Sequence, residues 1–557
     1  MRHGGQILVD ALAVNGVARV FSVPGESFLA ALDGLYASGI ANIVCRHEGG
    51  AAMMAEAQGK LTGRPGVAFV TRGPGASNAS AGVHVARQDS TPMILFVGQI
   101  ARGDRDREAF QEVDYRQMFG GLAKWVAEID QTERIPEYVA RAFHLAMSGR
   151  PGPVVLALPE DMLSARADVP DLSAFRPALP DVADSAVAAL AKALSAAERP
   201  LVVPGGTLWS QAAAEDLARF AVAWGLPVAV PFRRQGHMDN AHPNYVGDLG
   251  VGMSPALGQA LQKADCILAL GSRLGDTLTR GYELMDPVRP HLRVIHVHPS
   301  PDELGHLWAP DPGLVADPRA VVAALARLPA PRRWDDWTQC LRRAYEGWQQ
   351  PRATPGAVRM EDVITWLSAH LPEDAVLTNG AGNYAAFIHR YFRFRRFGSQ
   401  LAPTSGSMGY GLPAAIAAKL HDPGRSVVCL AGDGCLQMTV NELSTAVQHR
   451  AGVIVIVANN GRFGTIRMHQ ERSYPGRVSG TDLVNPDFAA VARAYGGHGA
   501  QVTRQDQFAP AFAQAQAHVR SAGTPAVIEL RLDPEALSTG ATLSETRAAG
   551  EALQSRA

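Results

Sequence analysis

The sequence predicts an α/β protein built from three doubly wound parallel-sheet domains. Short apolar runs alternate with helix-like, often alanine-rich segments along most of the chain, and many of these runs end in a turn of glycine or polar residues. This alternation is typical of parallel strands joined by helices, with functional loops at the carboxyl edge of each sheet. The length of 557 residues also exceeds what one hydrophobic core supports.

The first predicted domain spans residues 1–165. Its strand candidates are apolar runs that lead into turns, at 20–23, 43–45, 67–70, 93–97 and 151–159. A linker rich in Pro, Ala and Asp, at about 165–185, separates this domain from the next one.

The second predicted domain spans residues 185–330, and the third spans 357–535. The second has strand candidates at 200–204, 226–231, 266–270 and 294–298, and a Pro-rich connector near 329–356 follows it. The third has candidates at 375–377, 427–430, 453–458 and 526–530. The polar, alanine-rich residues 536–557 are interpreted as an irregular tail or a partly ordered flap.

Composition and charge exclude several classes of protein. A net charge of −1 gives no electrostatic footprint for nucleic acid or an anionic membrane. The five cysteines contain no CxxC pair, which fits a reducing compartment and argues against a disulfide framework or a zinc site. The N-terminus shows a helical pattern rather than a signal peptide, and no apolar stretch is long enough to span a bilayer. We therefore expect a cytoplasmic protein that binds neither nucleic acid nor membrane.

The most informative stretch is 427–461. A buried strand breaks at Gly432-Asp433-Gly434, a helix-like segment follows, and a second apolar run ends at Asn459-Asn460. Two parallel strands joined by a helix place their carboxyl ends at one edge of a sheet, so Asp433 and Asn460 are expected to face each other. Their oxygens suit Mg²⁺, and the glycines allow backbone N–H groups to approach phosphates.

The order GDG, then the 24 residues 435–458, then NN resembles the diphosphate and metal motif of the thiamine-diphosphate enzymes. Other segments resemble the acetolactate-synthase-like branch of that family: RHEGG at 46–50, TRGPGASN at 71–78, FQEVD at 110–114 and SGSMGYG at 405–411. The resemblance covers nearly the whole chain. It implies that the three domains are pyrimidine-binding, central and diphosphate-binding.

The resemblance also implies roles for individual residues. Glu48 is expected to be the catalytic carboxyl group beside the aminopyrimidine ring, where it promotes the imino tautomer that activates the cofactor. Phe110 is expected to form an apolar wall and Gln111 to hydrogen-bond the substrate. Met408 is expected to wedge between the cofactor rings. The implied cofactor contacts are Pro24, Glu48, Pro74, Asn78, Gly406, Met408, Gly432, Asp433, Gly434, Cys435 and Asn460. The implied Mg²⁺ ligands are Asp433, Asn460 and the main-chain carbonyl of Arg462.

Several positions depart from the family pattern and leave room for a different donor or acceptor. They are Glu26-Ser27, Arg72, where a small residue is often found, Asn383, and Glu160, where the biosynthetic enzymes carry lysine. Arg72 and His84 are candidates for either a substrate contact or a structural role, and Lys124 is predicted to be solvated. Glycine turns at 203–206 and 271–276 partly resemble segments that contact FAD, which leaves FAD undecided.

The reaction implied is decarboxylation of a 2-oxo acid, with pyruvate as the default donor, followed by ligation to a second carbonyl compound. An aldehyde-releasing decarboxylase and an acyl-transferring or carbon–carbon-cleaving relative stay open, and so does a non-catalytic regulatory subunit. The family architecture implies a homodimer or tetramer in which Glu48 and Asp433 of one site come from different chains.

Overall fold

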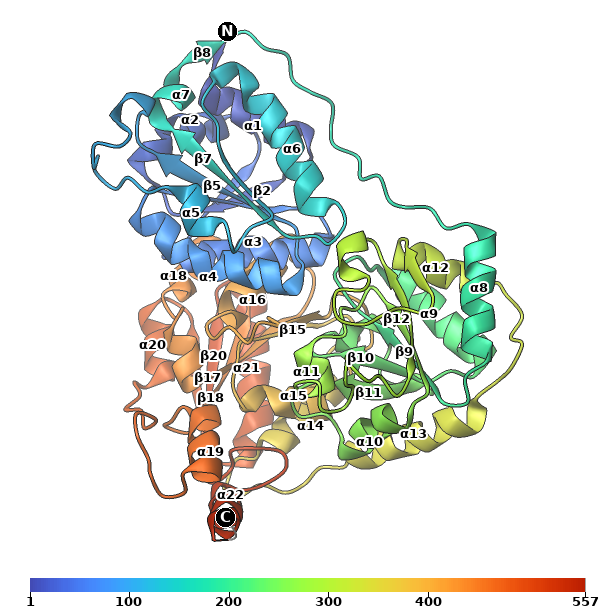
Figure 1. The fold of residues 1–557 in the computed structure, drawn as a ribbon. Coiled ribbons are helices and arrows are strands. Elements are labelled where there is room, and N and C mark those ends of the chain that lie inside the picture. The colour runs from blue at the N-terminus through green and yellow to red at the C-terminus, as the bar shows by residue number, and fades with distance from the viewer. Residues whose placement is uncertain (556–557) are drawn as a thin grey trace. The chain divides into compact units, whose positions relative to one another are not determined.

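The computed structural model describes residues 1–555 and contains three six-stranded parallel sheets in that range (Figure 1). The chain forms two compact units. The first combines Met1–Ala178 with Pro403–Pro423 and Thr439–Ala451. The second combines Leu179–Ala402 with Gly424–Met438 and the chain from Gly452 onward.

The first unit contains a parallel sheet with strand order β3-β2-β4-β5-β7-β6. Its strands are β2 (Arg19–Ser22), β3 (Ala41–Val44), β4 (Gly66–Val70), β5 (Met93–Gln99), β6 (Trp125–Glu128) and β7 (Pro153–Pro159). Its helices are α1 (Gly4–Val14), α2 (Leu29–Tyr36), α3 (Glu48–Thr62), α4 (Pro74–Asp89), α5 (Tyr115–Phe119), α6 (Ile135–Met147), α7 (Glu160–Ser164), α16 (Gly411–His421) and α18 (Glu442–Gln448). The short strands β1 (Arg2–His3) and β8 (Arg166–Ala167) pair antiparallel.

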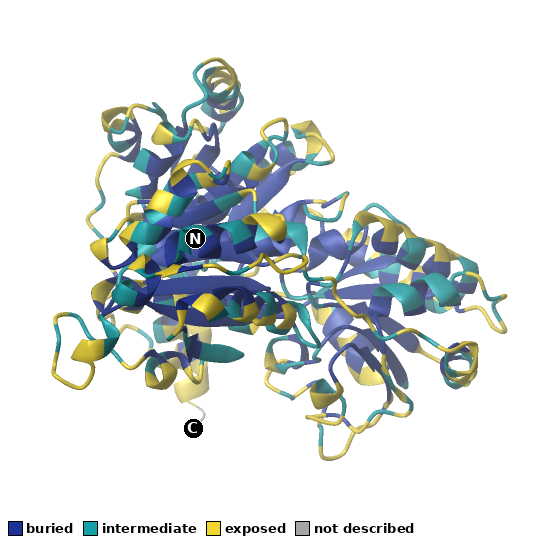
Figure 2. Cartoon of the chain, turned by 90° about the horizontal axis from the view of Figure 1, so that it is seen from above, coloured by how far each residue is buried: buried dark blue, intermediate teal, exposed yellow. Residues whose placement is uncertain are grey.

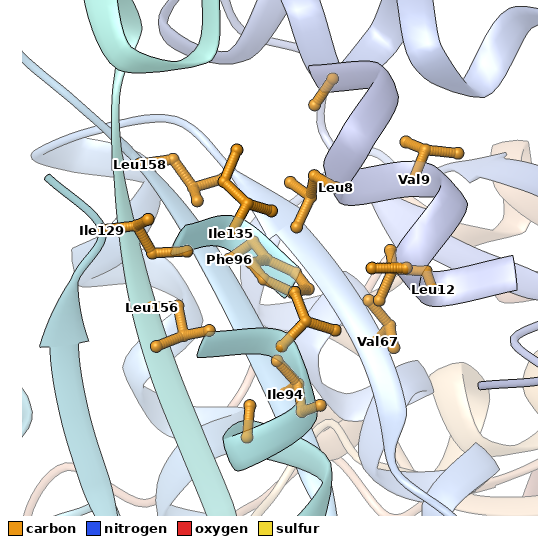
Figure 3. Packing of buried hydrophobic residues seen from close by; sticks show 14 of the residues in the cluster. Leu8, Val9, Leu12, Val67, Ile94, Phe96, Ile129, Ile135, Leu156 and Leu158 are labelled. Atoms are coloured by element: carbon orange, nitrogen blue, oxygen red, sulfur yellow. The ribbon is translucent and has the colours of Figure 1, made fainter. Parts of the chain in front are cut away.

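The core of this sheet forms because its strands are apolar on both faces, as expected for a parallel sheet covered by helices. Figure 3 shows Leu8 and Leu12 of α1 in the same hydrophobic cluster as Phe96 of β5 and Leu156 of β7, and all four side chains are fully buried. Each such side chain stabilises the fold by about 1.5–3 kcal/mol. Figure 2 shows the same pattern along the chain, with buried strands and exposed loops and outer helix faces.

The second unit contains two further parallel sheets, with orders β11-β10-β9-β12-β13-β14 and β16-β15-β17-β18-β20-β19. The first comprises β9 (Pro200–Pro204), β10 (Val228–Pro231), β11 (Tyr245–Leu249), β12 (Cys266–Leu270), β13 (Arg293–His298) and β14 (Gly313–Val315). The helices of that region are α8 (Asp184–Ser195), α9 (Gln211–Trp224), α10 (Pro255–Lys263), α11 (Asp276–Thr279), α12 (Pro318–Leu325) and α13 (Asp335–Trp348).

The other sheet of this unit comprises β15 (Val376–Asn379), β16 (Gln400–Leu401), β17 (Val427–Gly432), β18 (Ile454–Asn459), β19 (His498–Val502) and β20 (Ala526–Arg531). Its region contains α14 (Met360–His370), α15 (Tyr384–Tyr391), α17 (Asp433–Gln437), α19 (Gly464–Ser473), α20 (Phe488–Ala494), α21 (Phe508–Ser521) and α22 (Leu543–Gln554). None of the helices described within residues 1–555 is long and apolar enough to cross a membrane.

Two segments, one between and one after the predicted domains, contain helices that the sequence did not predict. The connector at 329–356 contains α13, because Thr338, Leu341 and Tyr345 recur at helical spacing and are buried. The predicted irregular tail contains α22, which Thr542 and Glu545 begin with a reciprocal capping box. The last two residues of that predicted tail, 556–557, lie outside the described residues.

The segment between β17 and β18 also differs from the prediction of one helix. It forms two helices, α17 and α18, rather than one continuous helix. The two helices belong to different compact units, since Met438 ends one stretch of the second unit and Thr439 begins a stretch of the first.

Candidate functional site

Asp433 lies at the carboxyl end of β17, beside the turn that ends β18. The two strands are paired in parallel, with Gly432 opposite Ala458. Asp433 Oδ2 accepts a hydrogen bond of 2.8 Å from the backbone N–H of Gly461, and Oδ1 accepts one of 2.8 Å from Gly434 N–H. Asp433 therefore neighbours the Asn459-Asn460 turn, as the sequence predicts.

Burial raises the pKa of Asp433, and hydrogen bonds from Gly434, Asn485 and Gly461 partly oppose that rise. Asn485 Nδ2 donates to Asp433 Oδ2 and to Asn459 Oδ1, over 2.8 and 2.9 Å. Asn485 is not among the residues that the sequence predicts for this site. It stands 52 residues after Asp433 in the chain, and no local pattern marks it.

The residues around Asp433 are suited to binding a cation and an anionic group next to each other. A carboxylate, the amide oxygen of Asn460 and main-chain oxygens form a hard donor set of the kind that Mg²⁺ prefers. The buried Nε of Arg462 has no hydrogen-bond partner within residues 1–555. No group of three or more His, Cys, Asp or Glu side chains suited to a metal occurs in that range, so amide and main-chain oxygens complete the predicted donor set.

Two glycines of the GDG turn are required by close packing. A Cβ atom on Gly434 would lie 2.5 Å from the ring of Phe463, and one on Gly432 would lie 3.0 Å from the ring of Tyr384. Tyr384 also donates a hydrogen bond of 3.2 Å from its hydroxyl to Cys435 Sγ. The segment 379–384 thus packs against the GDG turn. The N–H of Gly434, predicted as a phosphate donor, bonds to Asp433 Oδ1.

Glu48 is the first residue of α3 and lies beside the start of α4. Asn78 Nδ2 donates a hydrogen bond of 2.9 Å to Glu48 Oε2. A Cβ atom on Gly75 would lie 3.3 Å from Glu48 Oε1 and 2.9 Å from Thr71 Cγ2, so the glycine admits both side chains. The structure therefore brings Glu48 together with the segment 71–78, which forms the start of α4 from Pro74 onward. Pro74 and Pro24 at this edge are exposed.

Arg72 has a structural role that the sequence left open. Its guanidinium is buried, and it donates to Glu26, to Glu160 and to the backbone oxygen of Phe110, over 3.1, 3.0 and 3.2 Å. His84, the other residue weighed with Arg72, is exposed on α4.

Phe110 and Gln111 lie in the loop between β5 and α5. Phe110 is 72% exposed, and Gln111 adopts the left-handed backbone region with φ of 65°. Gly73 approaches this loop so closely that a Cβ atom on it would lie 3.0 Å from the Gln111 oxygen. A cavity of about 310 Å³ adjoins the same loop, with Glu112 and Tyr115 among its lining residues.

Met408 is partly buried and lies between two glycines with positive φ, Gly406 and Gly409. This segment is tied to the rest of its unit, because Thr439 Oγ1 donates 2.7 Å to the Gly409 oxygen and Tyr410 Oη donates 2.5 Å to Glu56 Oε2.

The prediction that Lys124 is solvated was wrong. Its Nζ donates a hydrogen bond of 2.7 Å to the Ser148 oxygen, and its stem lies against Gly152. Burial, together with the charges of Arg87 and Arg150, lowers the pKa of Lys124 to about 8.

The glycine turns of the central sheet are explained by contacts within the protein. Trp209 Nε1 donates to the Gly205 oxygen over 2.7 Å, and His237 Nε2 lies 3.0 Å from the Gly206 oxygen. A Cβ atom on Gly205 would lie 2.9 Å from Ser272. These glycines let two turns pack tightly together, which accounts for them with or without FAD.

The chain is similar to known proteins over most of its length. Models of the thiamine pyrophosphate enzymes match three parts of the chain: the N-terminal TPP binding domain at residues 2–118, the central domain at 187–325 and the C-terminal TPP binding domain at 380–530. The chain belongs to the thiamine pyrophosphate enzymes. The match to all three domains confirms the predicted family, fold class and enzymatic character, and thiamine pyrophosphate as the cofactor.

Curated members of this family are similar over most of their length. The acetolactate synthase isozyme 2 large subunit of Escherichia coli K12 is 32% identical over 510 residues, which cover 91% of this chain and 92% of that protein. The acetolactate synthase large subunit of Corynebacterium glutamicum is 32% identical over 536 residues, covering 92% and 84%. The isozyme 3 large subunit of E. coli K12 is 31% identical, covering 94% and 93%.

Proposed function

We propose that this enzyme decarboxylates a 2-oxo acid, with Mg²⁺ as a second cofactor, and ligates the remaining fragment to a second carbonyl compound. The names of its relatives support this type of reaction. The observation that carries the proposal is the position of buried Asp433 against the Asn459–Gly461 turn, which gathers a hard oxygen donor set beside the glycine turn.

When bound, thiamine diphosphate supplies a thiazolium electron sink for the electron pair left by loss of CO₂. Asp433, Asn460 and the Arg462 carbonyl would hold Mg²⁺, and Mg²⁺ would be completed by phosphate oxygens. Gly432, Gly434 and Cys435 form the tight turn beside them.

We assign to Glu48 the proton transfer at the aminopyrimidine ring. The hydrogen bond from Asn78 holds the Glu48 carboxylate in place. Met408 and Gly406 are assigned to the support of the cofactor rings, with Pro24 and Pro74 at their edge. Phe110 and Gln111 are assigned to the wall of the substrate site. The exposed ring of Phe110 leaves an apolar surface for a substrate or a second chain.

Product analysis tests the reaction. The protein loaded with Mg²⁺ and thiamine diphosphate is given a panel of 2-oxo acids, alone and paired with aldehydes, and the products are identified by mass spectrometry. A hydroxyketone or 2-hydroxy-3-oxo acid product supports ligation. Release of only a free aldehyde would favour the simple decarboxylase, and an acyl product would favour the transferring relative. A loaded protein that is inert to the whole panel would favour the regulatory subunit.

We also propose that the active site is shared between two copies of the chain in a homodimer or tetramer, as the family architecture implies. Mixed chains test this directly. Glu48→Ala and Asp433→Ala chains, each inactive alone, should regain part of the activity after subunit exchange, because one site then has both residues. Proven heterodimers without recovery would contradict the shared site. The five free cysteines are consistent with a cytoplasmic enzyme, which we keep as the proposed compartment.

A further inference from the structure

Arg72 joins two carboxylates that come from different strand ends of the first sheet. Glu26 follows β2, Arg72 follows β4, and Glu160 follows β7. The guanidinium donates from Nη2 to Glu26 and from Nη1 to Glu160, over 3.1 and 3.0 Å. We call Glu26, Arg72 and Glu160 the carboxylate bridge.

The exposed part of the carboxylate bridge is negative. The Arg72 side chain is 9% exposed, whereas those of Glu26 and Glu160 are 66% and 43% exposed. Two carboxylates and one guanidinium leave a net charge of −1, and the neighbouring pair of Arg102 and Asp161 adds none. A ligand that approaches this edge therefore meets carboxylate oxygens before it meets the guanidinium.

The carboxylate bridge contacts the loop that carries Phe110 and Gln111, which are the proposed wall of the substrate site. Arg72 Nε donates to the Phe110 oxygen, and the next residue, Gly73, packs against Gln111. On the other side of Arg72, Thr71 lies beside Gly75, which contacts Glu48. The negative edge is thus continuous with both the proposed proton-transfer residue and the proposed wall.

We propose that the carboxylate bridge determines the charge of the second substrate. It disfavours an acceptor that brings a second carboxylate to this edge and favours an uncharged carbonyl compound, such as a simple aldehyde. The physical reason is repulsion between like charges at the protein surface, where the effective dielectric constant is lower than in open water. The inference rests on the proposed function, because it deepens the choice of acceptor at the same site.

The decisive variants are Glu26→Gln, Glu160→Gln and the two combined. Glutamine keeps an oxygen that accepts from Arg72, so the geometry of the carboxylate bridge is retained while its charge changes from −1 to +1. With pyruvate as donor, we compare kcat/KM for a second 2-oxo acid and for acetaldehyde as acceptors. The wild type should prefer acetaldehyde. The double variant should shift the ratio toward the 2-oxo acid by about tenfold or more, and each single variant by less.

Glu346→Gln provides the matched control. Glu346 pairs with Arg342 over 2.8 Å and is half exposed, but it lies on α13 of the second unit. This variant should leave the acceptor ratio unchanged. Thermal unfolding of all variants checks that the fold is retained.

A binding measurement separates failure of this inference from failure of the proposed function. Calorimetry compares propionate with propionamide as non-reacting probes of the full chain. The double variant should gain affinity for propionate and not for propionamide. An unchanged acceptor ratio in a variant that still releases CO₂, or a wild type that prefers the second 2-oxo acid, would overturn the inference. If the wild type releases no CO₂ with any donor, the proposed function has failed, and unchanged propionate binding in the double variant would then overturn the inference on its own.

Discussion

Asn78 and Glu48 face each other across the first turns of α4 and α3, with a hydrogen bond of 2.9 Å from Asn78 Nδ2 to Glu48 Oε2. The amide therefore fixes one oxygen of the proposed proton-transfer residue. The other oxygen lies beside Gly75.

Replacing Glu48 by Gln should reduce turnover by about 100-fold or more, because the amide cannot exchange a proton with the cofactor ring. Thermal unfolding should change little, since Glu48 is only partly buried. Near-normal steady-state activity would contradict the assignment.

Replacing Asn78 by Ala should reduce kcat by about tenfold through loss of orientation of the Glu48 carboxylate. Ser80→Ala is the control, because Ser80 lies on the same helix and its hydroxyl donates to the Ser77 oxygen of that helix. Equal effects of the two substitutions would show that Asn78 acts through helix stability alone.

Asn485 donates a hydrogen bond to Asp433 Oδ2 but is not one of the predicted metal ligands. Replacing Asn485 by Ala should weaken Mg²⁺ binding by about 10–100-fold, as is typical when a group that orients a metal ligand is removed. Titration calorimetry with thiamine diphosphate present measures this change. Thr503→Ala, on an exposed loop, should leave Mg²⁺ affinity unchanged. If Asn485→Ala binds Mg²⁺ with wild-type affinity, Asn485 does not orient a metal ligand.

Lys60 links α3 to the end of α4 inside the first unit. It pairs with Glu56 over 3.2 Å and with Asp89, and all three side chains are buried. Replacing Lys60 by Met leaves two carboxylates buried together, so the free energy of unfolding should fall by about 3–5 kcal/mol. Urea denaturation checks this, with Glu346→Gln expected to change stability by about 0.5 kcal/mol or less. A similarly small effect of Lys60→Met would contradict a buried ion network.

The contact between α22 and α19 predicts a pH dependence. Arg547 donates two hydrogen bonds, of 2.7 and 2.8 Å, to buried Glu471 and is the main reason that the pKa of Glu471 falls to about 2. Because the folded pKa lies below the ordinary value, the stabilisation is present above about pH 5 and is lost as pH falls toward 2. It amounts to about 2–3 kcal/mol.

Arg547→Met should remove much of that acid sensitivity. Hydrogen exchange of α22 at pH 7 and pH 3.5 measures it: protection should fall with pH in the wild type and should be low at both values in the variant. Equal protection of α22 in both proteins at pH 7 would show that Arg547 does not hold the helix.

The sequence failed to predict the short pair β1 and β8, and it failed to predict one or both edge strands of each six-stranded sheet. β6, β11, β14, β16 and β19 are all edge strands of their sheets. The interior strands were found because burial on both faces requires a continuous apolar run, as in β5 and β18. An edge strand has a neighbour on one side only, so a short or polar sequence such as HGAQV of β19 suffices.

The sequence by itself determined the family, the three sheets and the spacing that brings Asp433 beside the Asn459–Gly461 turn. These features depend on apolar runs and glycine turns that are local in the chain, and the parallel topology brings their ends to one edge. The tertiary structure decided which side chains surround them: Asn485 at Asp433, Arg547 at Glu471, and Glu26 and Glu160 at Arg72. Such contacts join residues far apart in the chain. The local sequence around one of these residues does not specify which residue it will contact. The charge at the proposed substrate edge therefore depends on the fold, which places the ends of β2, β4 and β7 together.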